Sequence, residues 1–260
     1  MTASPTSCRV SAIVALNPHR HDLGCVLDGW AVQEAAGDHE VIVIHDGCRP
    51  GVDAEIAGHR ARNPRSPVRL VDSADRGRAA SNNTGIRASD GSLLLLVADD
   101  FVPDRGLVAA HRRFHALLDG PAVGIGPAYF PAAHRADPFC RWLEDTGALF
   151  GVAFGTAGVQ WRDHLFYVGN ASLLRTTFDR VGAFDERFLH DLFDDFEFGQ
   201  RLRATGIATH FVPRAIAWHD HEVTLDERRI ALRRLGEASA RYEATGPGPW
   251  PWSDVTARSS

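Results

Sequence analysis

The sequence contains no apolar run approaching the roughly 20 residues that a membrane-spanning helix needs. Its first nine residues lack a positively charged stretch followed by an apolar core, and the apolar stretch over residues 10–16 is too short for a signal sequence. These absences predict a cytoplasmic protein without a transmembrane segment.

The sequence also has no lysine and no cysteines at the spacing of a metal or redox motif. The four cysteines show no CxxC spacing and no metal-finger pattern, so we expect them to be reduced and buried. All 28 basic residues are arginine, which together with abundant alanine is typical of a GC-rich bacterial coding sequence. The formal net charge of −5 argues against a general nucleic-acid-binding protein, whose surface is basic.

What remains is an ordinary globular composition. The 260 residues are 44% hydrophobic and 23% charged, enough for one large domain or two small ones with a sizeable core. Thirteen histidines are many, so a few of them are candidate ligands.

Strand-like and helix-like segments alternate along the first half of the chain. Strands are predicted at residues 10–16, 40–44, 68–71, 92–98 and 122–125, and helices at about 23–30, 52–62, 79–88 and 105–118. This alternation predicts an α/β fold with a doubly wound, mostly parallel sheet. Right-handed crossovers then place every strand's carboxyl end at one edge.

Polar side chains follow three of these strands. Asn17, Asp46 and the pair Asp99 and Asp100 are expected to converge at the carboxyl edge, where open α/β sheets bind ligands. Two carboxylates suit Mg²⁺ or Mn²⁺, which usually accompany a bound phosphate. The alternative is helix capping: Asp104 would cap a helix that begins at residue 105, but capping explains two neighbouring aspartates poorly.

In the second half of the chain, strands and helices alternate less regularly. A helix is predicted at about 138–149, and the aromatic side chains around it are expected to form a local core or to line a cleft: Phe139, Trp142, Phe150, Phe154 and Trp161. A strand pair is predicted at 167–175, and Thr176 or Thr177 is expected to cap a short helix that ends at 181. The next predicted elements are a helix at 194–204, a strand at 207–212 and a helix at 225–244. In the last helix, Ile230, Leu235 and Tyr242 are expected to face inward. The tail over residues 247–260 contains Pro-Trp repeats and cannot be helical.

Several short segments occur together in a recognisable order and spacing. They include Val10-Ser-Ala-Ile-Val-Ala-Leu-Asn17, Glu40-Val-Ile-Val-Ile-His-Asp-Gly47, Arg76-Gly-Arg-Ala-Ala-Ser-Asn-Asn-Thr-Gly85, Val97-Ala-Asp-Asp100, Val181-Gly-Ala-Phe-Asp-Glu-Arg-Phe188, Asp194-Asp-Phe-Glu197 and residues 213–219. In these segments, which span about residues 10–222, the chain resembles family-two glycosyltransferases of the GT-A fold. The resemblance implies transfer of a sugar from a nucleoside diphosphate donor to an acceptor hydroxyl, with inversion and with Mn²⁺ or Mg²⁺. It implies one domain over residues 1–246, with a nucleotide-binding half at about 8–128 and an acceptor-binding, catalytic half at about 129–246.

The donor-binding residues follow from the resemblance position by position. Asp46 resembles the family's aspartate that reads the nucleotide base, while His45 and Cys48 depart from the usual Asp-Asp-Gly-Ser segment. Asn82 and Asn83 stand where the family usually has Arg-Asn near the base and the ribose. Family habit favours a UDP-sugar, and the departures at His45 and Asn82 leave thymidine and guanosine donors open. The acceptor would be a hydroxyl of a glycan, a lipid-linked sugar or a small molecule.

The metal ligands follow from the resemblance in the same way. Val97 occupies the first aspartate position of the family's Asp-x-Asp motif, which leaves Asp99 as its last member with Asp100 beside it. His219 resembles the family's third ligand, and an imidazole ligand would favour Mn²⁺. His221 is the competitor, because two residues further along a strand points to the same face.

Two adjacent acids remain for the chemistry. Asp195 resembles the catalytic base that takes the acceptor proton, and Asp194 is the alternative because the first acid of the family's pair is usually Glu. Neighbouring carboxylates repel one another, which raises the pKa of one of them. Glu197 and Arg201 are predicted to form a structural ion pair along the helix.

Two other functions compete with sugar transfer. A catalytically silent GT-A domain that binds a nucleotide or a glycan would account for the departures at His45, Asn82 and Val97. A nucleotidyltransferase would need a glycine-rich, basic loop after the first strand, and the segment Asn17-Pro-His-Arg-His21 has no glycine. The retained acids and His219 favour the enzyme over the silent domain.

Overall fold

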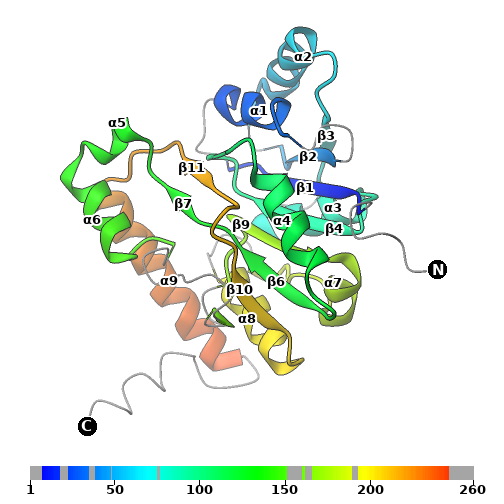
Figure 1. The fold of residues 1–260 in the computed structure, drawn as a ribbon. Coiled ribbons are helices and arrows are strands. Elements are labelled where there is room, and N and C mark those ends of the chain that lie inside the picture. Colours follow the sequence, from blue (N-terminus) through cyan, green and yellow to red (C-terminus); the bar gives the residue numbers. More distant parts are fainter. Residues whose placement is uncertain are drawn as a thin grey trace.

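A computed structural model describes residues 8–17, 23–34, 39–47, 49–74, 77–150, 160–161, 166–188 and 193–245 (Figure 1). The tail over residues 247–260, Cys48 and Phe154 lie outside the described residues, as does the side chain of Trp161.

A large sheet runs through the described part of the chain in the strand order β3-β2-β1-β4-β9-β6-β10-β8. Its strands are β1 (Val10–Ala15), β2 (His39–His45), β3 (Val68–Asp72), β4 (Leu93–Val97), β6 (Ala122–Ile125), β8 (Gln160–Trp161), β9 (Asn170–Leu174) and β10 (Ala208–Phe211). β1 pairs in parallel with β2 and β4, β2 with β3, and β6 with β10. β9 is antiparallel to β4 and β6, and β8 is antiparallel to β10. The prediction of an α/β fold with a mostly parallel sheet is confirmed.

A second, smaller sheet stands beside the first. In it β11 (Ala217–His219) lies between β5 (Phe101–Pro103), to which it is antiparallel, and β7 (Ala128–Tyr129), to which it is parallel. Figure 1 shows β7 and β11 side by side. This sheet brings the segment after β4 into contact with a segment more than 100 residues later in the chain.

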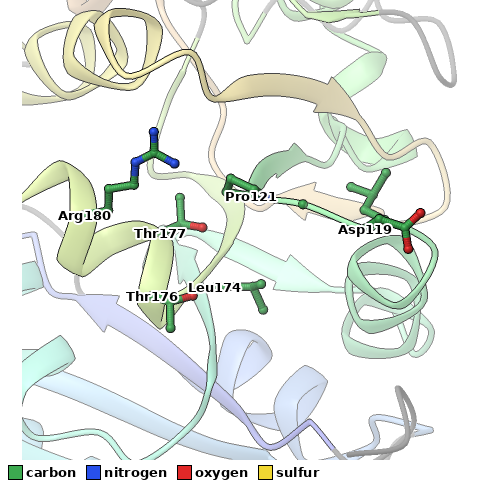
Figure 2. A pocket seen from close by; sticks show the side chains of 8 residues that line it. Asp119, Pro121, Leu174, Thr176, Thr177 and Arg180 are labelled. Atoms are coloured by element: carbon green, nitrogen blue, oxygen red, sulfur yellow. The ribbon is translucent and has the colours of Figure 1, made fainter. Parts of the chain in front are cut away.

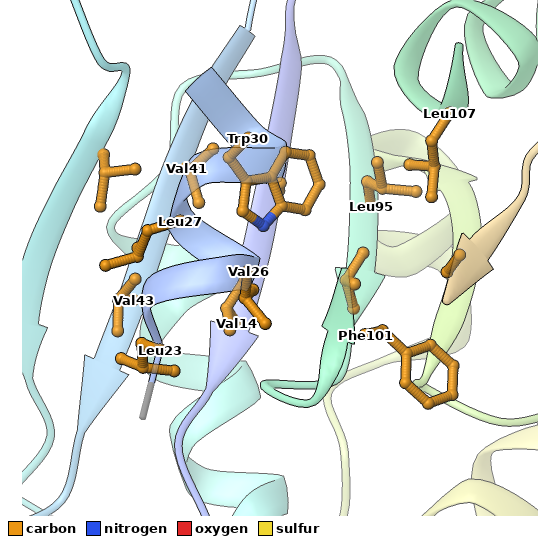
Figure 3. Close-up of a cluster of buried hydrophobic side chains, with 14 of the residues drawn as sticks. Val14, Leu23, Val26, Leu27, Trp30, Val41, Val43, Leu95, Phe101 and Leu107 are labelled. Atoms are coloured by element: carbon orange, nitrogen blue, oxygen red, sulfur yellow. The ribbon is translucent and has the colours of Figure 1, made fainter. Parts of the chain in front are cut away.

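The described part of the chain also contains the helices of this fold. They are α1 (Gly24–Ala31), α2 (Val52–Arg62), α3 (Arg78–Arg87), α4 (Leu107–Ala116), α5 (Ala132–Arg135), α6 (Pro138–Thr146), α7 (Arg175–Val181), α8 (Asp194–Ala204) and α9 (Leu225–Thr245). Because side chains alternate along a strand, Ala12 and Val14 of β1 enter one buried cluster while Ile13 enters the other. Figure 3 shows the first cluster, in which the apolar stripe of α1 lies against the sheet: Leu23, Val26, Leu27 and Trp30.

The structure corrects the prediction for residues 167–175. One strand, β9, replaces the predicted strand pair, because Gly169 is already bonded to the end of β4 through its carbonyl, which accepts the Ala98 N–H. β9 passes directly into α7, and the residue before that helix, Leu174, makes no side-chain cap. The predicted cap by Thr176 or Thr177 was therefore wrong.

The segment after β4 also differs from the prediction. Residues 101–103 pair with β11 as a strand, so α4 begins at Leu107, two residues later than expected, with Gly106 in the cap position. The Asp104 carboxylate accepts the Gly106 N–H at 3.3 Å, before the helix. The interpretation of Asp104 as the cap of a helix from residue 105 was wrong.

Three side chains that were expected to be buried are exposed. Ile230 is 54% exposed because it lies on the outer side of α9, whose inner side carries Ala238 and Tyr242. Trp142 is 53% exposed although it stacks on Phe139, and Cys25 is exposed on α1. Among the described helices, none combines the length and the apolar character needed to cross a bilayer.

Candidate active site

The two predicted acids lie in a tight turn between β4 and β5. The turn is closed by the Phe101 N–H, which donates to the Ala98 carbonyl at 3.2 Å. Asp99 is buried, and its Oδ2 accepts the backbone N–H of Asn17 at 2.7 Å. The end of β1 and the end of β4 therefore meet at the carboxyl edge, as the strand order predicted.

Asp100 contacts the predicted histidine. Because β11 pairs with β5, His219 stands opposite Phe101, and its Nε2 lies 3.0 Å from Asp100 Oδ2. The backbone reinforces this contact, since the Asp220 N–H donates to the Asp100 carbonyl at 2.8 Å. The His219 ring is buried, and its Nδ1 has no hydrogen-bond partner.

Aromatic rings surround this imidazole. The ring centroids of Phe101, Phe130 and Phe150 lie 5.2–5.4 Å from that of His219. Phe150 has a φ of +63°, a conformation that is strained for a bulky residue. His221, the competing ligand, lies 5.7 Å from His219 between ring centroids, and its Nε2 is 3.5 Å from Glu227 Oε1.

Asp46 lies at the carboxyl end of β2. Its Oδ2 accepts the backbone N–H of Gly77 at 3.3 Å, which holds the start of α3 against the end of β2. His45, the residue before it, faces Asp72 at the end of β3, with 3.6 Å between Nδ1 and Oδ1. The carboxyl edge of the large sheet therefore carries an imidazole–carboxylate pair next to Asp46.

The two asparagines of α3 are both buried. Asn83 uses both N–H groups of its amide, to the Phe184 carbonyl at 2.9 Å and to Glu186 Oε1 at 2.8 Å, and its Oδ1 accepts the Phe184 N–H. These bonds fasten α3 to the segment after α7 and point to a structural role for Asn83. Asn82 has a buried amide nitrogen without a partner.

The two candidate bases open α8 and have different surroundings. Asp194 is fully buried and accepts two bonds from Arg78, one of them from Nε at 3.0 Å and the other from Nη2. Asp195 Oδ2 lies 3.0 Å from Arg78 Nη2, whereas its Oδ1 is buried and has no hydrogen-bond partner. Burial raises the pKa of Asp195 to about 7; the Arg78 charge opposes this shift and the Asp194 charge adds to it.

Arg78 is the site residue that sequence reasoning missed. It lies within the segment over residues 76–85 that carries the resemblance, but its partners are 116 and 117 positions away. The predicted pair of Glu197 and Arg201 is present, with two contacts of 2.7 Å, and Arg201 also donates to the carbonyls of Val181 and Gly182.

Residues 9–237 match the family described as Glycosyltransferase like family 2. The chain belongs to this family. We therefore describe it as a glycosyltransferase domain, in agreement with the resemblance and with the GT-A fold of its structural neighbours.

Solved glycosyltransferases have the same fold. The mannosyltransferase PcManGT from Pyrobaculum calidifontis, solved in complex with GDP-Man and Mn²⁺, is similar over 98% of this chain and 70% of its own, with a TM-score of 0.64 and 19% identity. Glucosyl-3-phosphoglycerate synthase from Mycobacterium tuberculosis, in complex with phosphoglyceric acid, is similar over 95% and 83%, with a TM-score of 0.59 and 13% identity.

The curated relatives are longer proteins. Chondroitin synthase from Escherichia coli is 26% identical over 216 residues, which is 72% of this chain and 31% of that protein. The uncharacterized protein y4gI from Sinorhizobium fredii is 24% identical over 266 residues, which is 90% of this chain and 27% of that protein. The glycosyltransferase domain thus spans about a third or less of these relatives.

A divalent ion is implied by the family, and the residues present fit one. Asp99 and Asp100 offer hard oxygen atoms, and His219 offers a buried imidazole whose Nε2 lies 3.0 Å from Asp100 Oδ2. Among the residues that the structure describes, no three acids, histidines or cysteines stand close enough to enclose an ion by themselves. Sites of this kind commonly take one or two carboxylates from the protein and the remaining oxygens from a diphosphate. The donor set fits an ion shared with a nucleoside diphosphate.

A hollow of about 390 Å³ lies at the opposite edge of the sheet (Figure 2). It is lined by Leu118 and Pro121 before β6, by Leu174 at the end of β9 and by Arg180 of α7. Leu174 pairs with Leu93, the first residue of β4, so this hollow is remote from Asp99 and Asp100 beyond the last residue of β4. It does not belong to the candidate active site.

Proposed function

We propose that this domain transfers a sugar from a nucleoside diphosphate donor to an acceptor hydroxyl in one displacement, with inversion at the anomeric carbon. The observation that carries the proposal is the environment of Asp195. Its Oδ1 has no hydrogen-bond partner in the part of the chain that the structure describes, and burial raises its pKa to about 7, close to the value that suits a general base at neutral pH.

The acceptor oxygen bonds to the anomeric carbon while its proton passes to Asp195 Oδ1, and the bond from that carbon to the diphosphate oxygen breaks with its electron pair on the leaving group. Asp194 would hold Arg78 in place, because Arg78 engages both of its oxygens. Arg78 then keeps the Asp195 carboxylate oriented through Oδ2 and leaves Oδ1 to the acceptor.

Asp99, Asp100 and His219 would hold Mn²⁺ or Mg²⁺ together with the donor diphosphate. When bound, such an ion neutralises the negative charge that develops on the leaving group. Asn17 contributes by fixing Asp99 through its backbone N–H. This placement extends the metal-ligand hypothesis from sequence and leaves His221 as the competitor of His219.

Asp46 and Asn82 are the proposed contacts to the donor nucleoside. Asp46 lies at the edge that would face the base, and the buried amide nitrogen of Asn82 lacks a partner. Family habit favours uridine, while the similar mannosyltransferase was solved with GDP-Man, so both nucleosides enter the tests. A sugar hydroxyl is the acceptor chemistry that fits best, since one longer relative bears the name chondroitin synthase.

The test is Asp195→Asn, which keeps the size of the side chain and removes its ability to accept a proton. Sugar transfer should fall by about 10²–10⁴-fold, the usual contribution of a general base, while donor affinity stays within about twofold. Glu197→Gln is the matched control on the same helix, because Glu197 bonds Arg201 and not Arg78. An Asp195→Asn variant that transfers sugar at the parent rate would remove the base from this residue.

A further inference from the structure

Asn170 is a fully buried side chain that the proposed reaction does not use. It is the first residue of β9, the antiparallel strand between β4 and β6, and it pairs with Val97, the last residue of β4. The Ala98 N–H donates to the Gly169 carbonyl at 3.0 Å, and the Gly126 N–H donates to the Asn170 carbonyl at 2.9 Å. Asn170 therefore stands where β4 ends and the turn with Asp99 begins.

The amide of Asn170 bonds to two connections between the sheets, the one from β6 to β7 and the one from β10 to β11. Its Nδ2 donates to the Pro127 carbonyl at 3.1 Å and to the Ala215 carbonyl at 2.7 Å. Pro127 joins β6 to β7, and Ala215 lies between β10 and β11. One NH₂ group thus bonds to two of the three connections by which the described chain passes from the large sheet to the small sheet, and the third, from β4 to β5, carries Asp99 and Asp100.

The backbone around this amide is too tight for any side chain. A Cβ at Gly126 would collide with the Ala215 carbonyl oxygen and with the amide of Asn170. The Ala217 N–H, at the start of β11, also donates to the Pro127 carbonyl, at 3.0 Å. Contacts that converge on Asn170 therefore support the position of β11 relative to β4, beside the direct pairing of β11 with β5.

The orientation of the amide is fixed from the other side by a hydrogen-bond chain. Since Nδ2 faces two carbonyls, Oδ1 must accept from His111 Nε2, 2.9 Å away. His111 Nδ1 then accepts the single hydroxyl hydrogen of Ser172, at 2.8 Å, and the Ser172 oxygen accepts from His115 Nε2, at 2.9 Å. Burial lowers the pKa of His111 to about 4 and that of His115 to about 3, so both rings are neutral at neutral pH, as this chain requires.

From this geometry we propose that Asn170 is a positioning residue that sets the distance between the turn bearing Asp99 and Asp100 and the strand bearing His219. The turn begins just after the β4 residue paired with Asn170, and β11 begins two residues after Ala215. Losing the NH₂ group would let β11 shift relative to the turn, so the two parts of the metal-binding edge would lose their register. The inference rests on the proposed function, since it assumes that these residues share one divalent ion.

The experiment compares Asn170→Asp with Ser172→Ala. Asn170→Asp keeps the shape and cannot donate to the two carbonyls, whereas Ser172→Ala breaks the histidine chain on the same strand and leaves both carbonyl bonds in place. Both variants should melt at a lower temperature than the parent. The decisive readout is the affinity for UDP and GDP by calorimetry, measured with Mn²⁺ and with a chelator at a temperature where circular dichroism shows every variant folded.

In Asn170→Asp, the enhancement of nucleotide affinity by Mn²⁺ should fall about tenfold or more, as is typical when a residue that supports a metal ligand is removed. In Ser172→Ala, this enhancement should stay within about twofold of the parent's value. If Asn170→Asp does not fold, Asn170→Ser, which can donate to only one carbonyl, replaces it. Unchanged enhancement in the folded Asn170 variant, or an equal loss in Ser172→Ala, would overturn the inference alone. A parent protein without any Mn²⁺ enhancement would overturn the proposed metal-assisted function, and this inference with it.

Discussion

At the scale of single residues, two neighbouring aspartates differ because one cation distinguishes them. Arg78 occupies both oxygens of Asp194 and only one oxygen of Asp195. A carboxylate with both oxygens engaged by a guanidinium is a poor proton acceptor, since the charged form is held in place. The same cation opposes the upward shift that burial gives the pKa of Asp195.

We predict that Arg78→Gln narrows the pH range of activity. A base works only when it is deprotonated, so transfer should fall as the pH drops below about 7 in the parent. Without the Arg78 charge the aspartate pair holds its proton more tightly, its apparent pKa rises, and the acidic limb of the kcat/KM profile moves to higher pH.

The same variant should also lose about 3–5 kcal/mol of stability, because Asp194 remains buried without its partner. Arg87→Gln is the control: Arg87 lies on the same helix and is largely exposed, donates to the Thr84 hydroxyl at 2.9 Å and lies 3.9 Å from Glu186. If the folded Arg78→Gln protein loses activity at the same acidic pH as the parent, Arg78 does not have this role.

At the scale of the elements, α4 and β9 are joined by buried imidazoles. The folded protein holds His111 and His115 with pKa values of about 4 and 3, while an unfolded chain titrates them near 6.5. Stability from these residues is therefore fully present above pH 6.5 and is lost as the pH falls towards 4, by about 1.4 kcal/mol per pH unit for each group. Asp195 acts in the opposite direction between about pH 4 and 7, because its pKa is raised in the folded state.

We predict that His115→Gln makes the free energy of unfolding less dependent on pH. The glutamine amide still donates to Ser172, but the variant has one fewer group that takes up a proton on unfolding. Since Asp195 is the same in both proteins, the difference between their slopes from pH 6 to pH 4 should approach one proton. Denaturant titrations at several pH values measure it.

His134→Gln on α5 is the comparison variant, because it also replaces an imidazole by an amide and His134 lies outside this hydrogen-bond chain, 3.5 Å from Asp220. Equal slopes for the parent and His115→Gln would show that His115 is not held neutral. His210 of β10 faces His115 as well and contributes to the lowering of its pKa, so His210 stays unchanged in all these proteins.

At the scale of the whole molecule, the candidate active site is assembled from segments far apart in the chain. Asn17 and Asp46 follow β1 and β2, Asp99 and Asp100 follow β4, and His219 comes from the small sheet. A ligand that binds all of these segments stabilises the fold as a whole, since it binds only the folded state.

We predict that a nucleoside diphosphate with Mn²⁺ raises the melting temperature. At a ligand concentration 100 times Kd the gain is about 2.7 kcal/mol, which corresponds to roughly 5–10 °C for a chain of this size. UDP is expected to give the larger shift, with GDP and thymidine diphosphate as the comparison. Thermal melts with each nucleotide, with and without Mn²⁺, make the measurement.

Two variants identify where the nucleotide binds. Asp100→Asn should lose the Mn²⁺-dependent part of the shift and keep its fold, and Asp46→Ala should reduce the difference between nucleotides. If Asp46→Ala binds every nucleotide as well as the parent does, the base contact has been assigned to the wrong residue.

The amino-acid sequence by itself determined the local elements and the carboxyl edge. Periodicity predicted β6 and α2 with the bounds that the structure has, and the uninterrupted run Leu93–Val97 predicted a strand buried on both faces. The parallel order of β1, β2 and β4 follows from the alternation of strands and helices, so the meeting of Asn17 with Asp99 was predictable too.

Only the tertiary structure decided which distant residues act together. The pairing of β4 with β9, the pairing of β5 with β11 and the bonds from Arg78 to Asp194 join residues between 73 and 118 positions apart. Periodicity reports which face of an element is apolar, but strand partners and charge partners are chosen by packing after the elements meet. Because of that packing, Asp194 faces Arg78 with both oxygens, whereas Oδ1 of Asp195 has no hydrogen-bond partner among the described residues.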